Sequence, residues 1–533
     1  MNSLLIAVIS IVVLVLAYIF YSSKFEALLG ISEDALTPAH RKYDGIDFIP
    51  AKNWVVLFGH HFASISGAAP VIGPILALSI WGWGPTILWI ILGSVFIGGV
   101  HDFGSLAISV KQGGRSVADI TETVISKRAK IFFTSFVWLT LILVIAVFVY
   151  LCAKTLAYEP RIVVPSFGLI GIAIVIGILL YNVNANQFAV TLAGLAGLVL
   201  LIFLGKKYPV TIDVAKPEII WGYILLVYCF FASITPVNIL LQPRDYLSAF
   251  LLLFGVIFGY AGIIFSHPSM NMPFFSGWHI GTNAMWPMLF VTVACGAISG
   301  FHSLIASGTT SKQLSNETHA RRIGYGAMLL EAAVAILALL VVGAGLKNKE
   351  ILMTFLGKEG SGPIGAFGYG YGALTDSFLG GMGAFFAIVI LNAFILTTLD
   401  TATRIGRYLT HELFGIKNRY ISTIIVIVLS GWLGLSGNWA KIWPIFGAAN
   451  QLVAALALLV ITAWLLSRNA NIFYTAIPCV IMLLTTIGAL AYKIPKHFRT
   501  GDAILGTVSA ALLVLAIYML IEAFSKLDKA RLK

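Results

Sequence analysis

Long apolar runs, separated by short polar segments, make up most of the chain. A helix needs about 20 mainly apolar residues to cross the hydrocarbon core of a bilayer. The runs are continuous, whereas the strands of a transmembrane barrel alternate over shorter segments. The pattern predicts an all-α polytopic membrane protein with about fifteen transmembrane helices, near residues 1–22, 54–80, 86–110, 131–152, 165–182, 187–204, 218–236, 246–265, 288–306, 323–346, 378–403, 421–437, 442–466, 471–490 and 503–524.

The run at 54–80 is interrupted near its centre by the sequence Ser66-Gly67-Ala68-Ala69-Pro70. Proline breaks a helix, and in lipid the freed backbone groups are tolerated only where they face protein or a watery cavity. The same break, Cys295-Gly296-Ala297-Ile298-Ser299-Gly300-Phe301-His302-Ser303, lies about 233 residues further on in the run at 288–306. We therefore predict a discontinuous helix at the start of each half of the protein.

Two interrupted helices at corresponding places indicate the midplane substrate site of a secondary transporter. The alternative is that the Ser-Gly pairs only allow neighbouring helices to pack closely, as small residues do in membranes. On the first interpretation the substrate lies between the opposed half-helix ends. The candidate substrate-binding residues are then Ser64, Ser66, Gly67, Ala68, Ser299, Gly300, His302 and Ser303.

Composition agrees with a membrane protein. Hydrophobic residues make up 59% of the chain and charged residues 11%, against about 25% charged in soluble domains. The net charge of +12 does not indicate nucleic-acid binding, because every Lys and Arg can be placed in a loop, where basic residues orient a membrane protein. The cysteines show neither a disulfide framework nor a zinc motif and are expected to be small buried residues: Cys152, Cys229, Cys295 and Cys479.

The distribution of Lys and Arg between loops predicts the orientation. An odd number of spans places the termini on opposite sides of the membrane. The loops that contain more Lys and Arg face the cytoplasm if the carboxyl terminus is cytoplasmic and the amino terminus periplasmic. The first run lacks a cleavage site and is expected to be a retained helix. The two halves then form inverted five-helix repeats, with the expected division 1–53, 54–204 (first repeat), 205–287, 288–466 (second repeat) and 467–533.

The segment 347–377 is rich in glycine and is predicted to be an irregular surface loop at the outer mouth. Loops at the mouth of a site are often functional. The alternative for this segment is a mobile cover over the site.

Ionisable side chains within the predicted spans are costly and mark functional sites. Asp400 shares a helix face with Thr397, Thr401 and Arg404, by the spacing of three and four residues. Carboxylate and hydroxyl oxygens suit a hard cation such as Na⁺, so we expect the coupling cation or proton here. The alternative is an Asp400–Arg404 pair that only neutralises charge.

The remaining ionisable residues within spans are His60, His61, His101, Asp102, His302 and Glu331, with Asp376 at a helix end. Imidazole titrates near neutral pH and binds metals, so the pair His60-His61 has three interpretations: a proton- or substrate-linked role, packing, or a transition-metal site. Asp102 is a possible partner of either histidine. Glu331 suits a proton carrier, because burial favours the protonated carboxyl. Asn392 and Asn450-Gln451 either join helices or contact substrate.

Five stretches resemble the carbon starvation protein A family of peptide and pyruvate transporters. They are HHFASISGAAPVIGP (60–74), GGVHDFGSLAISVKQGGRSVADI (98–120), GYGAMLLE (324–331), TTLDTATRIGRY (397–408) and NQLVAALAL (450–458). The resemblance implies uptake of small peptides or pyruvate across the bacterial inner membrane during carbon starvation. It also implies the inverted-repeat fold of amino-acid transporters, with substrate at the breaks of core helices one (54–80) and six (288–306), and a cation between helices one and eight (378–403).

The sequence thus predicts a secondary active transporter that takes up small peptides by proton- or ion-coupled alternating access. A pyruvate/proton symporter is the alternative. A channel is disfavoured because the helices lack a continuous polar stripe, and a membrane enzyme because the polar groups lie within spans. We expect no cofactor other than a bound Na⁺ or similar cation.

Overall fold

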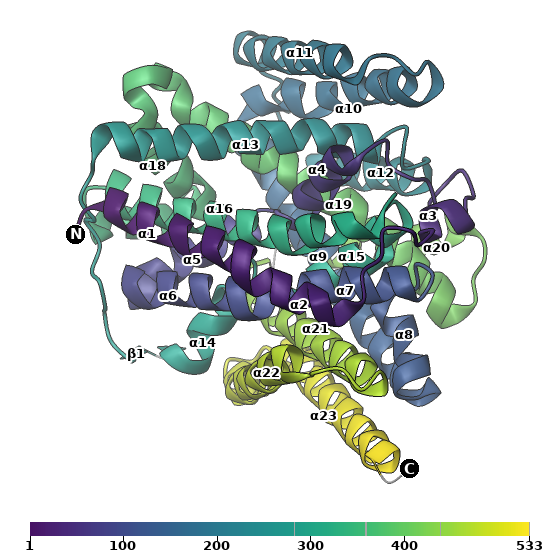
Figure 1. The fold of residues 1–533 in the computed structure, drawn as a ribbon. Coiled ribbons are helices and arrows are strands. Elements are labelled where there is room, and N and C mark those ends of the chain that lie inside the picture. Colours follow the sequence, from purple (N-terminus) through teal and green to yellow (C-terminus); the bar gives the residue numbers. More distant parts are fainter. Residues whose placement is uncertain (282, 358–359, 437–438, 532–533) are drawn as a thin grey trace.

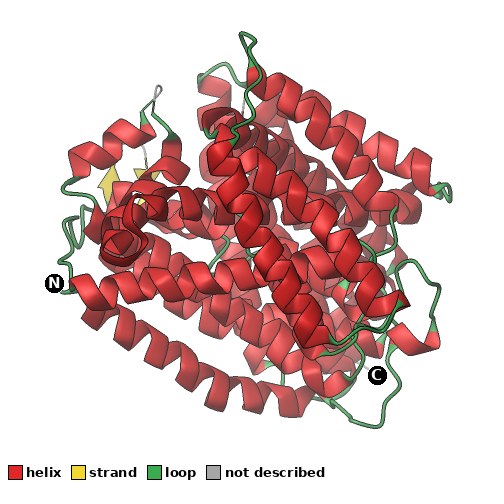
Figure 2. Cartoon of the chain, turned by 90° about the horizontal axis from the view of Figure 1, so that it is seen from above, coloured by secondary structure: helices red, strands yellow, loops and turns green. Residues whose placement is uncertain are grey.

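The computed structural model is almost entirely helical (Figures 1 and 2) and describes residues 1–281, 283–357, 360–436 and 439–531. The first half contains α1 (Ser3–Leu16), α2 (Ser22–Leu29), α3 (Pro38–Arg41), α4 (Trp54–Ile65), α5 (Ala69–Trp81), α6 (Trp83–Gly93), α7 (Gly99–Lys111), α8 (Val117–Val124), α9 (Lys127–Tyr158), α10 (Val163–Gly177), α11 (Gln187–Lys207), α12 (Pro217–Ile234) and α13 (Leu241–Ser266).

The second half begins after a small hairpin of β1 (His279–Ile280) and β2 (Asn283–Ala284), whose strands are antiparallel. Its helices are α14 (Met285–Thr292), α15 (Gly300–Gly308), α16 (Gly326–Gly345), α17 (Lys349–Leu356), α18 (Gly362–Leu379), α19 (Gly383–Phe414), α20 (Arg419–Gly434), α21 (Trp439–Ser467), α22 (Phe473–Arg499) and α23 (Ala503–Arg531). Figure 1 shows α22 and α23 beside α21 at the lower edge of the bundle, with α10 and α11 at the opposite edge.

Within the described residues, 11 helices are long and apolar enough to cross a membrane, or 12 if one bent pair counts as a span. The predicted polytopic all-α class is therefore confirmed, but the count of fifteen is not. Part of the difference lies in α14 and α15, which are too short to count separately. Another part lies in the segments Arg419–Gly434 and Gly506–Glu522, which are apolar but shorter than 18 residues.

The first predicted discontinuity is present between α4 and α5, whose axes differ by 41°. Helix α4 ends at Ile65, and Ser66 has non-helical backbone angles. Helix α5 has a proline in its first turn. Proline is tolerated there because the N–H that it lacks would have no hydrogen-bond partner within the helix. The sequence Ser66-Gly67-Ala68 therefore separates two half-helices, as predicted.

The second discontinuity is also present but lies a few residues earlier in the chain than the predicted stretch Cys295–Ser303. Helix α14 ends at Thr292 and α15 starts at Gly300, so Ser303 lies inside the helix and not in the break. A Cβ added to Gly296, whose φ is +88°, would lie 2.6 Å from the Cβ of Ala335 and 3.6 Å from that of Pro70. The second break therefore packs directly against the start of α5, and the two breaks are neighbours.

The glycine-rich segment 347–377 is mostly helical, which corrects the prediction of an irregular loop. Its glycines serve close packing: a Cβ on Gly345 would lie 2.6 Å from the carbonyl oxygen of Gly370. Gly372 and Gly368 contact Ala384 and Ile388, so α18 lies antiparallel to the start of α19. Small residues let helix backbones approach in this way, and the sequence signal for a loop was in fact a signal for helix contact. Residues 358 and 359 lie outside the described chain.

Gly300 should be among the least replaceable residues of the fold. Its added Cβ would lie 2.5 Å from the backbone nitrogen of Ala454 on α21, and backbone atoms cannot move aside as a side chain can. We expect Gly300→Ala to destabilise the protein by about 1–3 kcal/mol, seen as a lower melting temperature in detergent. Gly171→Ala on α10 is the matched control, because nothing lies within 4 Å of its added Cβ. Equal melting temperatures for the two variants would contradict the packing of α15 on α21.

Candidate functional site

Two buried polar clusters flank the helix breaks. The first, here called the histidine–carboxylate cluster, joins His101 and Asp102 on α7, His302 on α15 and Glu331 on α16. Asp102 accepts hydrogen bonds from Nδ1 of His101 at 2.7 Å and from Nδ1 of His302 at 2.8 Å. Nε2 of His302 lies 3.2 Å from a carboxylate oxygen of Glu331. All four side chains are fully buried.

The second cluster, here called the arginine cluster, is centred on Arg244 of α13. Its guanidinium forms ion pairs with the neighbouring Asp245 and with Asp400 of α19. Tyr228 of α12 accepts a hydrogen bond from Arg244 and donates one to Asp400, both at 2.6 Å. Nδ1 of His60 on α4 lies 2.6 Å from Asp245. The cluster therefore connects the first broken helix to α12, α13 and α19.

Arg244 and Asp245 were missed by the sequence analysis, and their burial corrects the expectation that every Lys and Arg lies in a loop. Arg244 is 2% exposed and Arg404 is fully buried. The predicted span began at Tyr246, but α13 begins at Leu241 because Pro243 is tolerated in a first helical turn. The sequence feature that could have identified them is this pair of adjacent opposite charges, Arg244 and Asp245, at the edge of an apolar run.

The alternative pairing of Asp400 with Arg404 is not formed. Arg404 instead donates to Asp47, in the segment before α4, at 2.7 Å, and to backbone carbonyls at the end of α12. The hydroxyl of Thr397 is bonded to a backbone carbonyl of its own helix, and that of Thr401 lies 3.2 Å from Ser64. The oxygen atoms expected around a cation at Asp400 are therefore not gathered there, and a guanidinium contacts the carboxylate.

The two adjacent histidines of α4 have separate surroundings. His60 contacts Asp245, whereas Nδ1 of His61 lies 2.8 Å from the hydroxyl of Thr310, and its Nε2 has no hydrogen-bond partner within the described chain. Asp102 pairs with neither of them. Adjacent helical positions point in different directions, which explains the separation.

Most of the predicted substrate residues use their polar groups to hold the breaks in place. Ser64 contacts Thr401, and the hydroxyl of Ser303 donates to the carbonyl of Gly300. Asn450 of α21 accepts the Phe301 N–H at 2.8 Å and donates to Ser299 at 2.9 Å, so it caps α15. A further polar residue, Asn392, joins α19 to Ser166 and Cys152, and Gln451 donates to a carbonyl of α14.

Ser66 differs from the other predicted substrate residues. It lies in the first break with 2% of its surface exposed, and its hydroxyl has no hydrogen-bond partner among the described residues. Gly67 follows it, and a Cβ there would lie 2.8 Å from the hydroxyl of Thr398. Ala68, the N-cap of α5, provides no side-chain cap. The start of α5 is therefore a buried helix end with an unused hydroxyl beside it.

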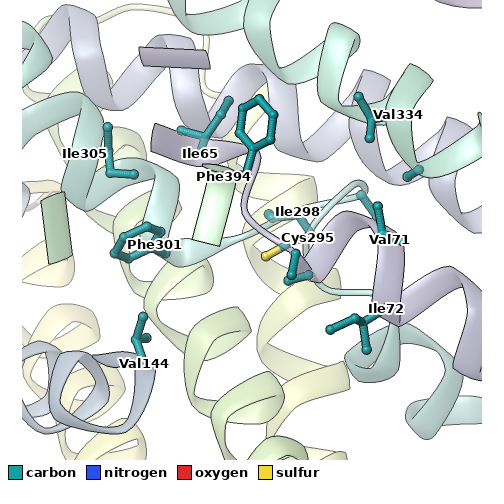
Figure 3. Close-up of a cluster of buried hydrophobic side chains, with 14 of the residues drawn as sticks. Ile65, Val71, Ile72, Val144, Cys295, Ile298, Phe301, Ile305, Val334 and Phe394 are labelled. Carbon is teal, nitrogen blue, oxygen red and sulfur yellow. The ribbon is translucent and has the colours of Figure 1, made fainter. Parts of the chain in front are cut away.

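A cavity of about 260 Å³ reaches α5 at Ile72, in the first turn of the helix. It also reaches one side of α9 and the start of α18, and Lys154 is its charged lining residue. Pockets for small molecules usually have about 300–1,000 Å³, so this cavity suits a small solute. Figure 3 shows Ile72 with Val71, Cys295 and Ile298 in the apolar core around the breaks.

Asp47 ties the segment before α4 to α19. Burial alone would raise the pKa of Asp47, but the guanidinium groups of Arg404 and Arg407 outweigh burial and lower the pKa to about 2. A carboxyl whose pKa is lowered in the folded state stabilises that state above its ordinary pKa of about 4, and this stabilisation is lost as the pH falls from 4 to 2.

We therefore expect Asp47→Asn to lower the free energy of unfolding by about 2 kcal/mol at pH 7. The difference from the unaltered protein should shrink toward pH 3 and vanish near pH 2, as measured by melting temperatures across this range. Asp34→Asn, an exposed residue of the same segment, should change nothing at either pH. A deficit of Asp47→Asn that persists unchanged at pH 2 would contradict the ion pairs.

The fold and the two facing helix breaks define a helical membrane protein of the class to which secondary transporters belong. The fold is similar to that of a manganese transporter from Eremococcus coleocola, with a TM-score of 0.53 and 14% sequence identity, covering 91% of this chain and 99% of that one. At this identity the likeness concerns the fold alone.

The family is defined by the sequence itself. The model of the family described as "Carbon starvation protein CstA" matches residues 2–354 and 353–489. The chain therefore belongs to the carbon starvation protein CstA family.

Two curated relatives carry different substrate names. The chain is 32% identical to the peptide transporter CstA of Campylobacter jejuni, covering 95% of this chain and 82% of the relative. It is 31% identical to the pyruvate/proton symporter BtsT of Escherichia coli, covering 92% and 82%. Both names are those of transporters, as the sequence predicted.

Proposed function

We propose that this protein is a secondary active transporter that takes up small peptides across the bacterial inner membrane when carbon is scarce. Two neighbouring helix breaks, with the unused hydroxyl of Ser66 in the first of them, carry the proposal. Broken helices with irregular backbone at membrane depth are tolerated where they line a site. The name of the Campylobacter jejuni relative supports peptide as the substrate class.

The start of α5 suits a substrate carboxylate. The amino end of a helix carries a partial positive charge and unsatisfied N–H groups, which bind anions. Asn450 already caps α15, whereas α5 has no side-chain cap. We therefore place the carboxylate of the substrate at Ser66, Gly67 and Ala68, with Lys154 drawing it into the adjacent cavity.

The arginine cluster supports coupling to a proton. Asp400 and Asp245 share the single guanidinium of Arg244, and Oδ1 of Asp400 has no hydrogen-bond partner within the described residues. A proton on Asp400 would weaken its contact with Arg244 and change the connection between α13 and α19. Coupling then requires that the outward and inward states differ in proton affinity. Na⁺ at Asp400 would first have to displace the guanidinium.

Pyruvate is the second candidate substrate. The 260 Å³ cavity is below the usual range for small-molecule sites, and the Escherichia coli relative is named as a pyruvate/proton symporter. Pyruvate carries the carboxylate that the start of α5 would bind but lacks the amino group of a peptide.

The orientation that we propose places the amino terminus in the periplasm and the carboxyl terminus in the cytoplasm, as the basic loops predict.

Gradient-driven uptake into proteoliposomes tests the proposal. Labelled dialanine and labelled pyruvate are compared, each under an imposed proton gradient, an imposed sodium gradient or neither. We expect dialanine to accumulate and the accumulation to collapse when the proton gradient is dissipated. Accumulation of pyruvate alone would establish the second candidate, and accumulation of neither solute would refute both.

A further inference from the structure

Three metal-ligating side chains meet at the second helix break. Cys295 lies in the segment between α14 and α15, His302 on α15 and Glu331 on α16. The thiol, one imidazole nitrogen and one carboxylate oxygen lie within 4.8 Å of one another. The residues are 6%, 0% and 0% exposed, and Figure 3 shows Cys295 within the apolar core around the breaks.

The polar atoms of His302 and Glu331 that lie between the three side chains lack the hydrogen bonds that buried polar groups normally make. Nε2 of His302 and both carboxylate oxygens of Glu331 complete no hydrogen bond to any described residue. The ion contact of 3.2 Å between His302 and Glu331 is their shared interaction. A buried carboxylate that makes no hydrogen bond is costly. These nitrogen and oxygen atoms are therefore able to bind a metal ion.

The surrounding residues orient the three side chains as partners of metal ligands do. Nδ1 of His302 donates to Asp102 at 2.8 Å, so Nε2 is the nitrogen that faces Glu331 and, in the neutral ring, carries the lone pair. Histidines that bind metals almost always make this second hydrogen bond. The amide of Asn450 donates toward the sulfur of Cys295 at 3.8 Å, as it would toward a thiolate.

The charge of the site also favours a cation. The histidine–carboxylate cluster holds two buried carboxylates, Asp102 and Glu331. Among the ion pairs of the described chain, theirs involve only histidines, whereas Asp400 and Asp245 share Arg244. Buried charges in a membrane protein require compensation, and a divalent ion between Glu331 and His302 would supply it.

We propose that Cys295, His302 and Glu331 bind a divalent transition-metal ion of the Zn²⁺ class. Ligands at about 2.0–2.3 Å from a tetrahedral ion lie roughly 3.3–3.8 Å from each other. His302 and Glu331, at 3.2 Å, are within about 0.1 Å of this range, and the thiol has to move by about 1 Å or less. Sulfur and imidazole ligands select Zn²⁺, Co²⁺ or Fe²⁺ over Mg²⁺ and Ca²⁺.

Three protein ligands leave the fourth position of a tetrahedral site open, as in sites that bind a further ligand. The proposal departs from the sequence-based roles of His302 in substrate binding and Glu331 in proton transfer. It does not depend on which solute is transported, or on coupling at Asp400. It also places the metal away from His60 and His61, the pair that the sequence suggested.

Cobalt binding to the purified full-length protein tests the proposal. The protein in detergent is stripped with a chelator, titrated with Co²⁺ and followed by absorption spectroscopy, and bound metal is counted after dialysis. We expect one Co²⁺ per chain with a thiolate-to-cobalt charge-transfer band, displaced by Zn²⁺. Cys295→Ser should abolish the band, and Glu331→Gln should weaken binding at least tenfold.

Cys479→Ser is the matched control, because Cys479 is equally buried but lies far along the chain on α22. It should keep both the band and the stoichiometry. If Cys295→Ser does not run as a single species in gel filtration, the test of the proposal is the Co²⁺ affinity of Glu331→Gln. Less than about one Co²⁺ per ten chains, or a band that survives Cys295→Ser, would overturn the proposal. Transport of dialanine or pyruvate by the stripped protein would leave the proposed function intact, so the two proposals can fail separately.

Discussion

Asp400→Asn is expected to reduce gradient-driven uptake at least tenfold while leaving counterflow largely intact. Asparagine keeps the shape of the side chain but carries no charge and does not take up a proton. Removing one partner of a buried ion pair can cost about 3–5 kcal/mol, but Arg244 keeps Asp245 and Tyr228 as partners. The protein should therefore fold and exchange solute, and lose the response to the gradient.

Uptake of labelled dialanine and pyruvate under a proton gradient measures this effect, with counterflow of the same solutes in parallel. Asp376→Asn is the control, because Asp376 is an exposed carboxylate near the carboxyl-terminal end of α18. That variant should behave like the unaltered protein. Full accumulation by Asp400→Asn would exclude Asp400 from coupling and leave the arginine cluster a purely structural element.

Ser66→Trp is expected to abolish both gradient-driven uptake and counterflow. Ser66 is buried in the first helix break, and an indole there would fill the space beside the start of α5. Loss of both activities distinguishes a blocked substrate site from lost coupling.

Ser66→Ala should fold normally, because the hydroxyl has no partner among the described residues. It should weaken uptake about fivefold if the hydroxyl binds substrate, since one hydrogen bond contributes about 1 kcal/mol.

Leu88→Trp is the control for the size of the new side chain. Leu88 on α6 is 57% exposed, on the outside of the bundle, where an added indole meets no protein core. Its uptake should match that of the unaltered protein. If Ser66→Trp transported at the normal rate, the substrate site would have to lie away from the first break.

Local sequence determined the membrane class of this protein and the position of its first broken helix. The apolar runs define which segments can enter a bilayer, because transfer into lipid depends on the composition of each segment. The sequence Ser66-Gly67-Ala68-Ala69-Pro70 breaks a helix through its own backbone chemistry. These properties need no knowledge of neighbouring helices, and the structure agrees with them.

Only the tertiary structure decided which buried polar residues are partners. Asp400 pairs with Arg244 and not with Arg404 of its own helix, and Asp102 pairs with His302 and not with His60 or His61. Likewise α18 is a helix because its glycines meet α16 and α19. Such contacts join residues far apart in the chain, and burial fixes them by requiring every charge to find compensation. A pattern along one helix contains no information about what packs against it.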